Sequence, residues 1–129
     1  MTMLLSEICP LLLCNVYSGK EQMTDIHVHF GCASDLMSDV LAFSRAGAIL
    51  MTGLANLQTI QTAFIAEISA VVLVRGKRPS KDMIDMAKEK RIPLLGTPYS
   101  MYEACGILYG KGLVSTMEPA VSRATHANK

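Results

Sequence analysis

The sequence lacks the features that mark a membrane protein, a secreted protein or a nucleic-acid-binding protein. Its formal net charge is only +1, which gives no overall field to attract nucleic acid or an anionic membrane. The apolar N-terminus has no Lys or Arg before Lys20 and is interrupted by Glu7 and Pro10, unlike a signal peptide. No stretch approaches the roughly 18 apolar residues of a membrane span. We expect a soluble, cytoplasmic protein that binds neither nucleic acid nor a membrane.

Paired cysteine motifs are also missing. The chain has four cysteines without regular spacing: Cys9, Cys14, Cys32 and Cys105. Since cysteine often packs as a small buried hydrophobe, we expect four reduced thiols. His27 and His29 alternate along an apolar run and can begin a zinc site, but zinc needs further ligands, which Cys14 or Cys32 would have to supply. We therefore predict no metal and no cofactor.

The sequence has none of the common catalytic or nucleotide-binding fingerprints. It contains no Gly-x-Gly-x-x-Gly, no Walker-type Gly-x-x-x-x-Gly-Lys-Ser/Thr and no Gly-x-Ser-x-Gly elbow, and no cysteine has a recognisable histidine partner. Helix capping already accounts for Thr97 and Ser100. We do not expect an enzyme.

What the sequence does contain is an alternation of short apolar runs with helix-period segments. With 129 residues, half of them hydrophobic, the chain can build one core. The β-rich runs are Ile26–Phe30, Ala48–Thr52, Ala70–Val74 and Pro93–Gly96. Strands that alternate with helices imply βαβ crossovers, so we predict an α/β fold with a mainly parallel sheet of about four to six strands. A helix near Met3–Leu12 and a strand near Asn15–Tyr17 precede this core.

Start signals accompany the predicted helices. Ser34, Asn56 and Ser80 are candidate N-caps, and Ser100 with Glu103 forms a capping-box pattern. We assign residues 1–114 to one domain and residues 115–129 to a polar C-terminal extension. Nine methionines and the high apolar content favour a helix face buried against a second copy, that is, a homodimer.

The candidate binding site lies where the parallel strands end. Four glycine-containing loops should meet at the carboxyl edge of the sheet, each leading into a helix N-terminus: Gly31–Asp35, Gly53–Asn56, Arg75–Pro79 and Gly96–Ser100. Such an edge suits a small anionic ligand, although glycine and an N-cap are what any βα loop needs. Asp35 and Asp39 are spaced to share a helix face. The candidate ligand-binding residues are Ser34, Asp35, Ser38, Asp39, Arg75, Lys77, Arg78, Thr97 and Tyr99.

Several segments resemble one known family. Gly31–Val40 is similar to the Gly-x-x-Ser-Asp-Leu-Leu-Ser-x-Val segment of small DRTGG-domain proteins. Val71–Pro79, Ile92–Ala104 and Leu108–Leu113 look like the rest of that domain, so the resemblance covers roughly residues 3–113. It implies the α/β fold of the N-terminal domain of HPr kinase/phosphorylase. DRTGG domains occur in phosphotransacetylases and between the CBS domains of regulated pyrophosphatases, where they help to form dimers near a nucleotide site.

Two functions follow from the residues and the resemblance together. The first is a non-catalytic regulatory module that binds a small anionic metabolite or nucleotide at the carboxyl edge of the sheet. The second is a protein-interaction module without a small-molecule site, which dimerises and docks onto a redox enzyme, because stand-alone relatives are encoded beside hydrogenase genes in anaerobic bacteria.

Overall fold

The structure of the protein, a computed structural model, describes residues 2–116. Strands and helices alternate along the chain, as the sequence predicts. In chain order the elements are β1 (Met3–Leu4), α1 (Leu5–Leu11), β2 (Asn15–Ser18), η1 (Lys20–Gln22), β3 (His27–Val28), β4 (Phe30–Ala33), α2 (Met37–Phe43), β5 (Ala48–Thr52), α3 (Leu57–Ile65), β6 (Ala70–Leu73), α4 (Lys81–Glu89), β7 (Leu94–Gly96) and α5 (Met101–Gly110).

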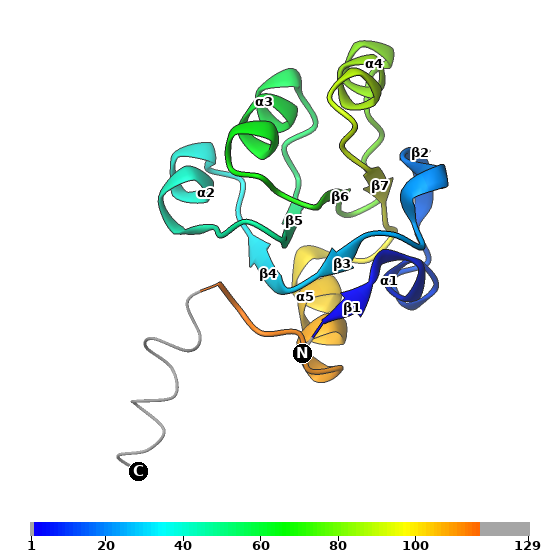
Figure 1. The fold of residues 1–129 in the computed structure, drawn as a ribbon, viewed down its shortest axis with the longest axis vertical. Helices are drawn as coiled ribbons and strands as arrows, with labels where there is room; N and C mark the ends of the chain where they lie inside the picture. Colours follow the sequence, from blue (N-terminus) through cyan, green and yellow to red (C-terminus); the bar gives the residue numbers. More distant parts are fainter. Residues whose placement is uncertain (1, 117–129) are drawn as a thin grey trace.

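Four parallel strands form most of the main sheet (Figure 1). The spatial order is β2-β7-β6-β5-β4, in which β4 to β7 are parallel and β2 pairs antiparallel with β7 at one edge. A helix connects each parallel strand to the next, as parallel pairing requires. The predicted mainly parallel α/β sheet is confirmed.

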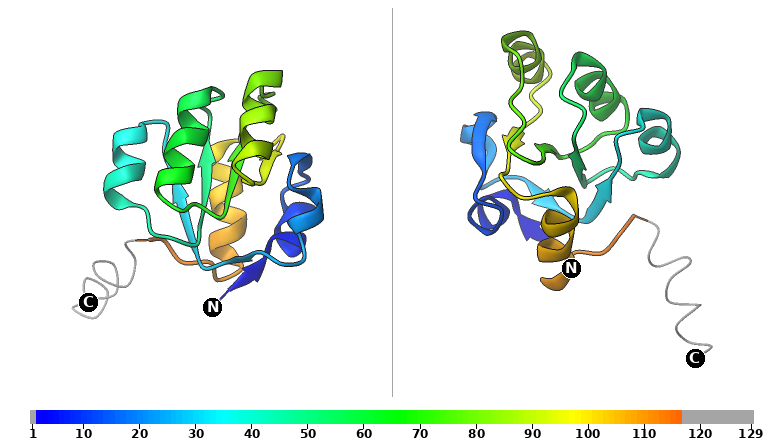
Figure 2. Two further views of the ribbon diagram at one scale, coloured as in Figure 1. Left: turned by 45° about the horizontal axis from the view of Figure 1, so that its top comes forward. Right: turned by 180° about the vertical axis from the view of Figure 1, so that it is seen from behind.

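Helices cover both faces of this sheet (Figures 1 and 2). One layer consists of α2, α3 and α4, and the other of α1, α5 and the small β1–β3 pair. Along β5, Ile49 and Met51 join the core cluster of α1 and α5, whereas Ala48 and Leu50 join that of α2, α3 and α4. All of Val71–Val74 is buried, as expected for a strand covered on both faces.

Three helices begin at the predicted caps. The side chains of Asn56 and Ser80 each accept a hydrogen bond, 3.2 Å long, from the N–H three residues later. Ser100 and Glu103 form the expected capping box at the start of α5. These bonds satisfy N–H groups that have no partner within the helix. The caps also fix where the loops of the carboxyl edge end.

Two expectations for the first half of the chain are wrong, and a third is confirmed with a later start. Ile26–Phe30 is not one strand, because it divides into β3, which pairs with β1, and β4, which lies at the edge of the main sheet. The helix predicted near Met3–Leu12 is present as α1, although it starts only at Leu5 because β1 comes first. Ser34 is not an N-cap, because α2 begins only after Leu36. Its hydroxyl instead accepts a hydrogen bond of 3.0 Å from the Leu36 N–H, a local turn that competes with helix formation.

After α5 the chain returns to the edge of the sheet. The Gly31 N–H donates to the Val114 carbonyl at 2.8 Å, and Ser115 forms a parallel bridge with Gly31. The predicted C-terminal extension therefore starts beside β4, and its residues 117–129 lie outside the described part of the chain.

Candidate functional site

The carboxyl ends of the four parallel strands meet at one edge, where the candidate residues were expected. The loops there span residues 34–36, 53–56, 74–80 and 97–100. The first is shorter than predicted because Gly31, Cys32 and Ala33 belong to β4. Side-chain and backbone hydrogen bonds connect all four loops.

Gly53 joins three of these loops. Its N–H donates to the Asp35 carboxylate at 2.6 Å, and the Thr52 hydroxyl donates to the same oxygen at 3.0 Å. The Gly53 carbonyl accepts a hydrogen bond of 2.7 Å from the Lys77 ammonium group. A carboxylate and a cation thus hold the two sides of one peptide segment, and charge-assisted bonds of this kind are stronger than neutral ones.

Backbone contacts join the loop of Arg75 to the loop that precedes α5. The Arg75 N–H donates to the Tyr99 carbonyl at 2.8 Å, and the Gly76 N–H donates to the Thr97 carbonyl at 2.9 Å. The Thr97 hydroxyl, which is buried, donates to the Leu12 carbonyl at 2.5 Å. Thr97 therefore fastens the edge to the turn after α1.

Cations predominate on the third loop. Arg75, Lys77 and Arg78 are all exposed. Within residues 2–116 the sole salt bridge joins Lys81 to Asp85, so none of the three cations is paired with a described carboxylate. A group of positive charges without a carboxylate partner is suited to an anion.

The acidic candidates are more scattered. Asp35 precedes α2, so the expectation that Asp35 and Asp39 share a helix face is wrong. Ser38 and Asp39 are exposed on α2. The structure places Asp35 at the sheet edge and Asp39 on the wall of a nearby cavity.

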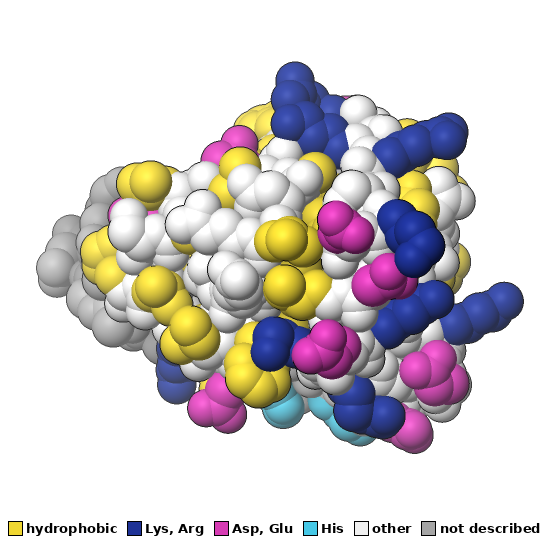
Figure 3. Space-filling view, turned by 90° about the horizontal axis from the view of Figure 1, so that it is seen from above, with side chains coloured by type: hydrophobic (Ala, Val, Ile, Leu, Met, Phe, Trp, Pro, Cys, Tyr) yellow, Lys and Arg dark blue, Asp and Glu magenta, His cyan; other side chains and the backbone are white. Residues whose placement is uncertain are grey.

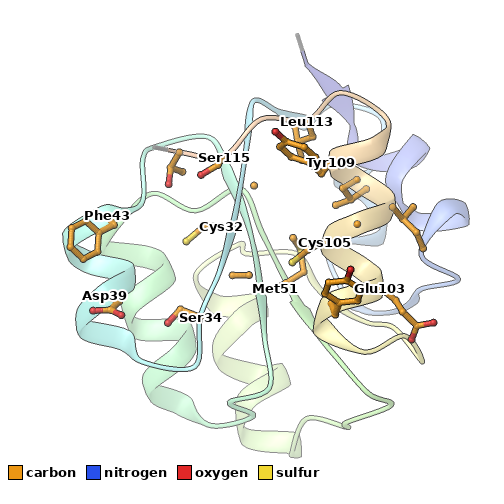
Figure 4. Close-up of a pocket in the computed structure, with 17 residues that line it drawn as sticks. Cys32, Ser34, Asp39, Phe43, Met51, Glu103, Cys105, Tyr109, Leu113 and Ser115 are labelled. Carbon is orange, nitrogen blue, oxygen red and sulfur yellow. The ribbon is translucent and has the colours of Figure 1, made fainter. Parts of the chain in front are cut away.

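This cavity has a volume of about 870 Å³ and lies between β4 and α5 (Figure 4). Ser34 and Asp39 lie at one end of it, and Cys32 and Cys105 face it from opposite walls. Its size falls in the range of small-molecule sites. The lining residues are Gly31, Cys32, Ala33, Ser34, Asp39, Phe43, Met51, Tyr102, Glu103, Cys105, Gly106, Ile107, Leu108, Tyr109, Leu113, Ser115 and Thr116.

Of the predicted ligand-binding residues only Ser34 and Asp39 belong to this lining, and of the predicted glycine loops only Gly31–Asp35 contributes to it. The signal that could have indicated the cavity lies in α5, whose apolar side chains do not form a single stripe. Ala104 and Leu108 are buried, while Tyr102 and Tyr109 are 89% and 56% exposed. A helix that carries apolar groups on more than one side has a second surface to cover. That surface forms one wall of the cavity.

Two other classes of site can be assessed for residues 2–116. No helix in this range has the length and apolar character needed to cross a bilayer. No three His, Cys, Asp or Glu side chains in this range come together as a metal-binding group. His27 and His29 are exposed, and all four cysteines are free thiols.

Comparison with known proteins gives the family of the fold. No curated protein matches the chain. A similar solved structure comprises the CBS and DRTGG domains of the regulatory region of Clostridium perfringens pyrophosphatase, complexed with its activator diadenosine tetraphosphate. The TM-score is 0.68 at 20% identity, over 80% of this chain and 44% of the other, so the match covers less than half of that solved chain. The DRTGG domain model matches residues 7–109, and the chain therefore belongs to the DRTGG domain family.

Proposed function

We propose that the chain is a non-catalytic regulatory module that senses a small anionic metabolite or nucleotide at the carboxyl edge of its sheet. The observation that carries this proposal is the meeting of four connected loops beside three exposed cations, Arg75, Lys77 and Arg78, that no described carboxylate neutralises. Ligands of open α/β sheets bind at this edge, and Arg groups suit phosphate oxygens.

The residues of the edge have different roles in this proposal. Arg75 and Arg78 supply charge to the ligand, and Lys77 and Asp35 hold the loops through their bonds to Gly53. Thr97 and Tyr99 close the site from the α5 side. Ser34, Ser38 and Asp39 orient polar groups of the ligand.

The neighbouring cavity provides the apolar part of the same site. It starts at Ser34, which directly follows β4, and continues between Cys32 and Cys105. A nucleotide has both a flat base and anionic phosphates, so it suits an apolar cavity that opens at Ser34, in the loop that Asp35 and Gly53 connect to the cationic loop of Lys77. The pyrophosphatase regulatory region, which has this fold, is complexed with a nucleotide activator, and this supports the proposal by analogy.

The hydrogen bonds that the hydroxyl groups already make support a non-catalytic role. At this edge and at the helix starts, six hydroxyls hydrogen-bond to nearby groups: those of Ser34, Thr52, Thr59, Ser80, Thr97 and Ser100. Two of them donate to a carboxylate, Thr52 to Asp35 and Ser100 to Glu103, but each of these carboxylate oxygens also accepts a backbone N–H as part of a turn or cap. These hydroxyls stabilise turns and caps.

The test is a thermal-shift titration of the full chain with ATP, diadenosine tetraphosphate and inorganic phosphate. A ligand of the native state raises stability by about 2.7 kcal/mol at a hundredfold excess over its dissociation constant. We expect the R75Q/R78Q variant to lose the shift. K20Q/K88Q is the charge-matched control. Lys20 follows Ser18, which pairs with Leu94 at the amino end of β7, and Lys88 lies in the last turn of α4, the end that leads away from the carboxyl edge.

A cavity-filling variant, C105F, tests the apolar part of the site. It should weaken the response to nucleotides while leaving any response to inorganic phosphate unchanged. If R75Q/R78Q and K20Q/K88Q respond alike, or if no probe shifts the folded wild type, the proposed ligand site is wrong.

A second function, dimerisation as an interaction module, is favoured by the surface of α2 and α3. Figure 3 shows hydrophobic side chains gathered over these helices, whereas Lys and Arg lie over α4. Leu41, Phe43, Phe64 and Ile65 are 50%, 52%, 53% and 70% exposed. Contiguous apolar patches on soluble proteins mark interaction sites. The occupant that we propose is a second copy of the chain, and docking onto a redox enzyme would be a further use of the dimer.

Light scattering measures the mass of the oligomer and so tests whether the chain forms a dimer. The wild type should have twice the chain mass and the L41E/I65E variant the mass of one chain. Y102E, which places a single glutamate on exposed Tyr102 of α5, should remain a dimer. A monomeric wild type, or a Y102E variant that dissociates as L41E/I65E does, would contradict this second function.

A further inference from the structure

Three sulfur atoms gather where α1 leads into β2. Cys9 lies in α1, Cys14 directly precedes β2 and Met23 follows η1. The Cys9 thiol contacts the Met23 thioether at a sulfur–sulfur distance of 3.6 Å. A side-chain hydrogen bond with Cys14 lowers the pKa of the Cys9 thiol, and the same bond together with burial raises the pKa of Cys14. Cys9 thus interacts with both of the other residues.

The backbone holds these residues in place. The Cys14 N–H donates to the Cys9 carbonyl at 2.9 Å, across a turn in which Leu13 has a φ of 52°. The Ser6 N–H donates to the Met23 carbonyl at 3.0 Å, which fixes the segment after η1 to the start of α1. The sulfur atoms are thus brought together by the fold and not by side-chain rotation alone, which is the preorganisation that a ligand set requires.

The three side chains are half-buried, so an ion can reach them from solvent. Their inner sides pack against the core cluster that contains Leu5, Ile8 and Leu12. Sulfur side chains also pack simply as hydrophobes. The contacts between the sulfurs themselves are what distinguish this group from Cys32 and Cys105, which lie on the cavity walls.

We propose that Cys9, Cys14 and Met23 form a binding site for a soft monovalent cation of the Cu(I) type. Thiolate and thioether sulfurs select Cu(I), and carboxylates and carbonyls suit the harder ions. A structural zinc ion takes four Cys, His or carboxylate ligands, and no group of even three such side chains occurs within residues 2–116. Two thiolates and one thioether are a sufficient set for Cu(I). Binding would release the thiol protons to solvent.

The site is independent of the proposed anion site, and its test uses Cu(I) alone. The reduced full-length protein is titrated under anaerobic conditions against a chromophoric Cu(I) chelator. We expect one equivalent of Cu(I) to bind to the wild type and to raise its melting temperature. The C9S/C14S variant should lose this binding, and M23L should bind one equivalent more weakly.

The matched control is C32S/C105S, which removes the same number of half-buried thiols and should bind Cu(I) as the wild type does. Circular dichroism establishes that each variant is folded. If C9S/C14S does not fold, C14S and M23L test the site separately. X-ray absorption of the loaded protein should show only sulfur ligands.

Three results would overturn the proposal. One is equal Cu(I) binding by C9S/C14S and the wild type. Another is an equal loss in C32S/C105S, which would mean that any thiol suffices. The third is a first coordination shell of nitrogen or oxygen.

Discussion

The carboxylate of Asp35 accepts a hydrogen bond of 2.6 Å from the backbone N–H of Gly53, so the loop after β4 is fixed to the loop after β5. The same peptide segment is held on its carbonyl side by Lys77. The edge that we propose as the ligand site is therefore shaped before any ligand binds, and Asp35 is central to that shape.

Replacing Asp35 by Ala should lower the free energy of unfolding by about 1–2 kcal/mol, because two donors, the Gly53 N–H and the Thr52 hydroxyl, lose their acceptor. Urea denaturation measures the change. D25A is the control, since Asp25 is an exposed aspartate. D35N retains an acceptor oxygen and should lie between the wild type and D35A. A D35A variant as stable as D25A would contradict this role.

Thr97 provides a second test of how the edge is fastened. Its buried hydroxyl donates to the Leu12 carbonyl and accepts from the Tyr99 N–H. The T97V variant keeps the shape of the side chain but leaves both groups unpaired, so it should destabilise the protein by about 1–3 kcal/mol in urea denaturation.

T97S keeps the hydroxyl and serves as the matched control for T97V. It should lose less stability than T97V, since only a methyl group is removed. If T97S and T97V were equally unstable, the methyl group and not the hydrogen bonds would explain the effect.

Two glycines allow backbone strain to be separated from steric overlap. Gly19 and Gly76 both have positive φ, 87° and 69°. A Cβ atom at position 19 would lie 2.8 Å from the Pro93 Cα atom, whereas one at position 76 would meet nothing within 4 Å. G76A should therefore show only the left-handed strain of about 1–2 kcal/mol.

G19A should be less stable than G76A by at least about 1 kcal/mol, since the backbone of Pro93 would have to move in a packed region. Thermal or urea unfolding of both variants measures the difference. Equal destabilisation would mean that the contact with Pro93 adjusts freely.

The parts of the fold that depend on local sequence could be predicted. Ala48–Thr52 is recognised by its apolar β-branched run, and Asn56, Ser80 and Ser100 are recognised by residue type next to a helix-period segment. In each case the signal and the structure that it specifies lie within a few residues.

The errors concern pairings between distant segments. Ile26–Phe30 has the composition of one strand, but β3 pairs with β1 more than twenty residues earlier while β4 joins the main sheet. Asp35 has the spacing of a helix residue, but its carboxylate bonds to Gly53. Periodicity contains no information about such partners.

Only part of the candidate site could be predicted, because the cavity also depends on a pairing between distant segments. The rule that parallel strands end at one edge placed the four loops together. The cavity depends on how α5 packs against β4, although α5 begins 68 residues after β4 ends, so neither Cys32 nor Cys105 could be assigned to it from sequence.

The thiols of Cys32 and Cys105 report on this cavity through their ionisation. Burial raises the pKa of both above the ordinary thiol value of 9.0, and the nearby charge of Cys105 raises the pKa of Cys32 further. A raised pKa means less thiolate at a given pH, and the thiolate is the form that iodoacetamide alkylates.

In a C9S/C14S background, the pH midpoint of alkylation should therefore lie higher in the native protein than in the same protein unfolded in urea. Adding C105S should move the Cys32 midpoint part of the way back, and mass spectrometry assigns each rate to its residue. Native midpoints equal to the unfolded ones would mean that these thiols are solvated and that α5 does not form a wall of the cavity beside them.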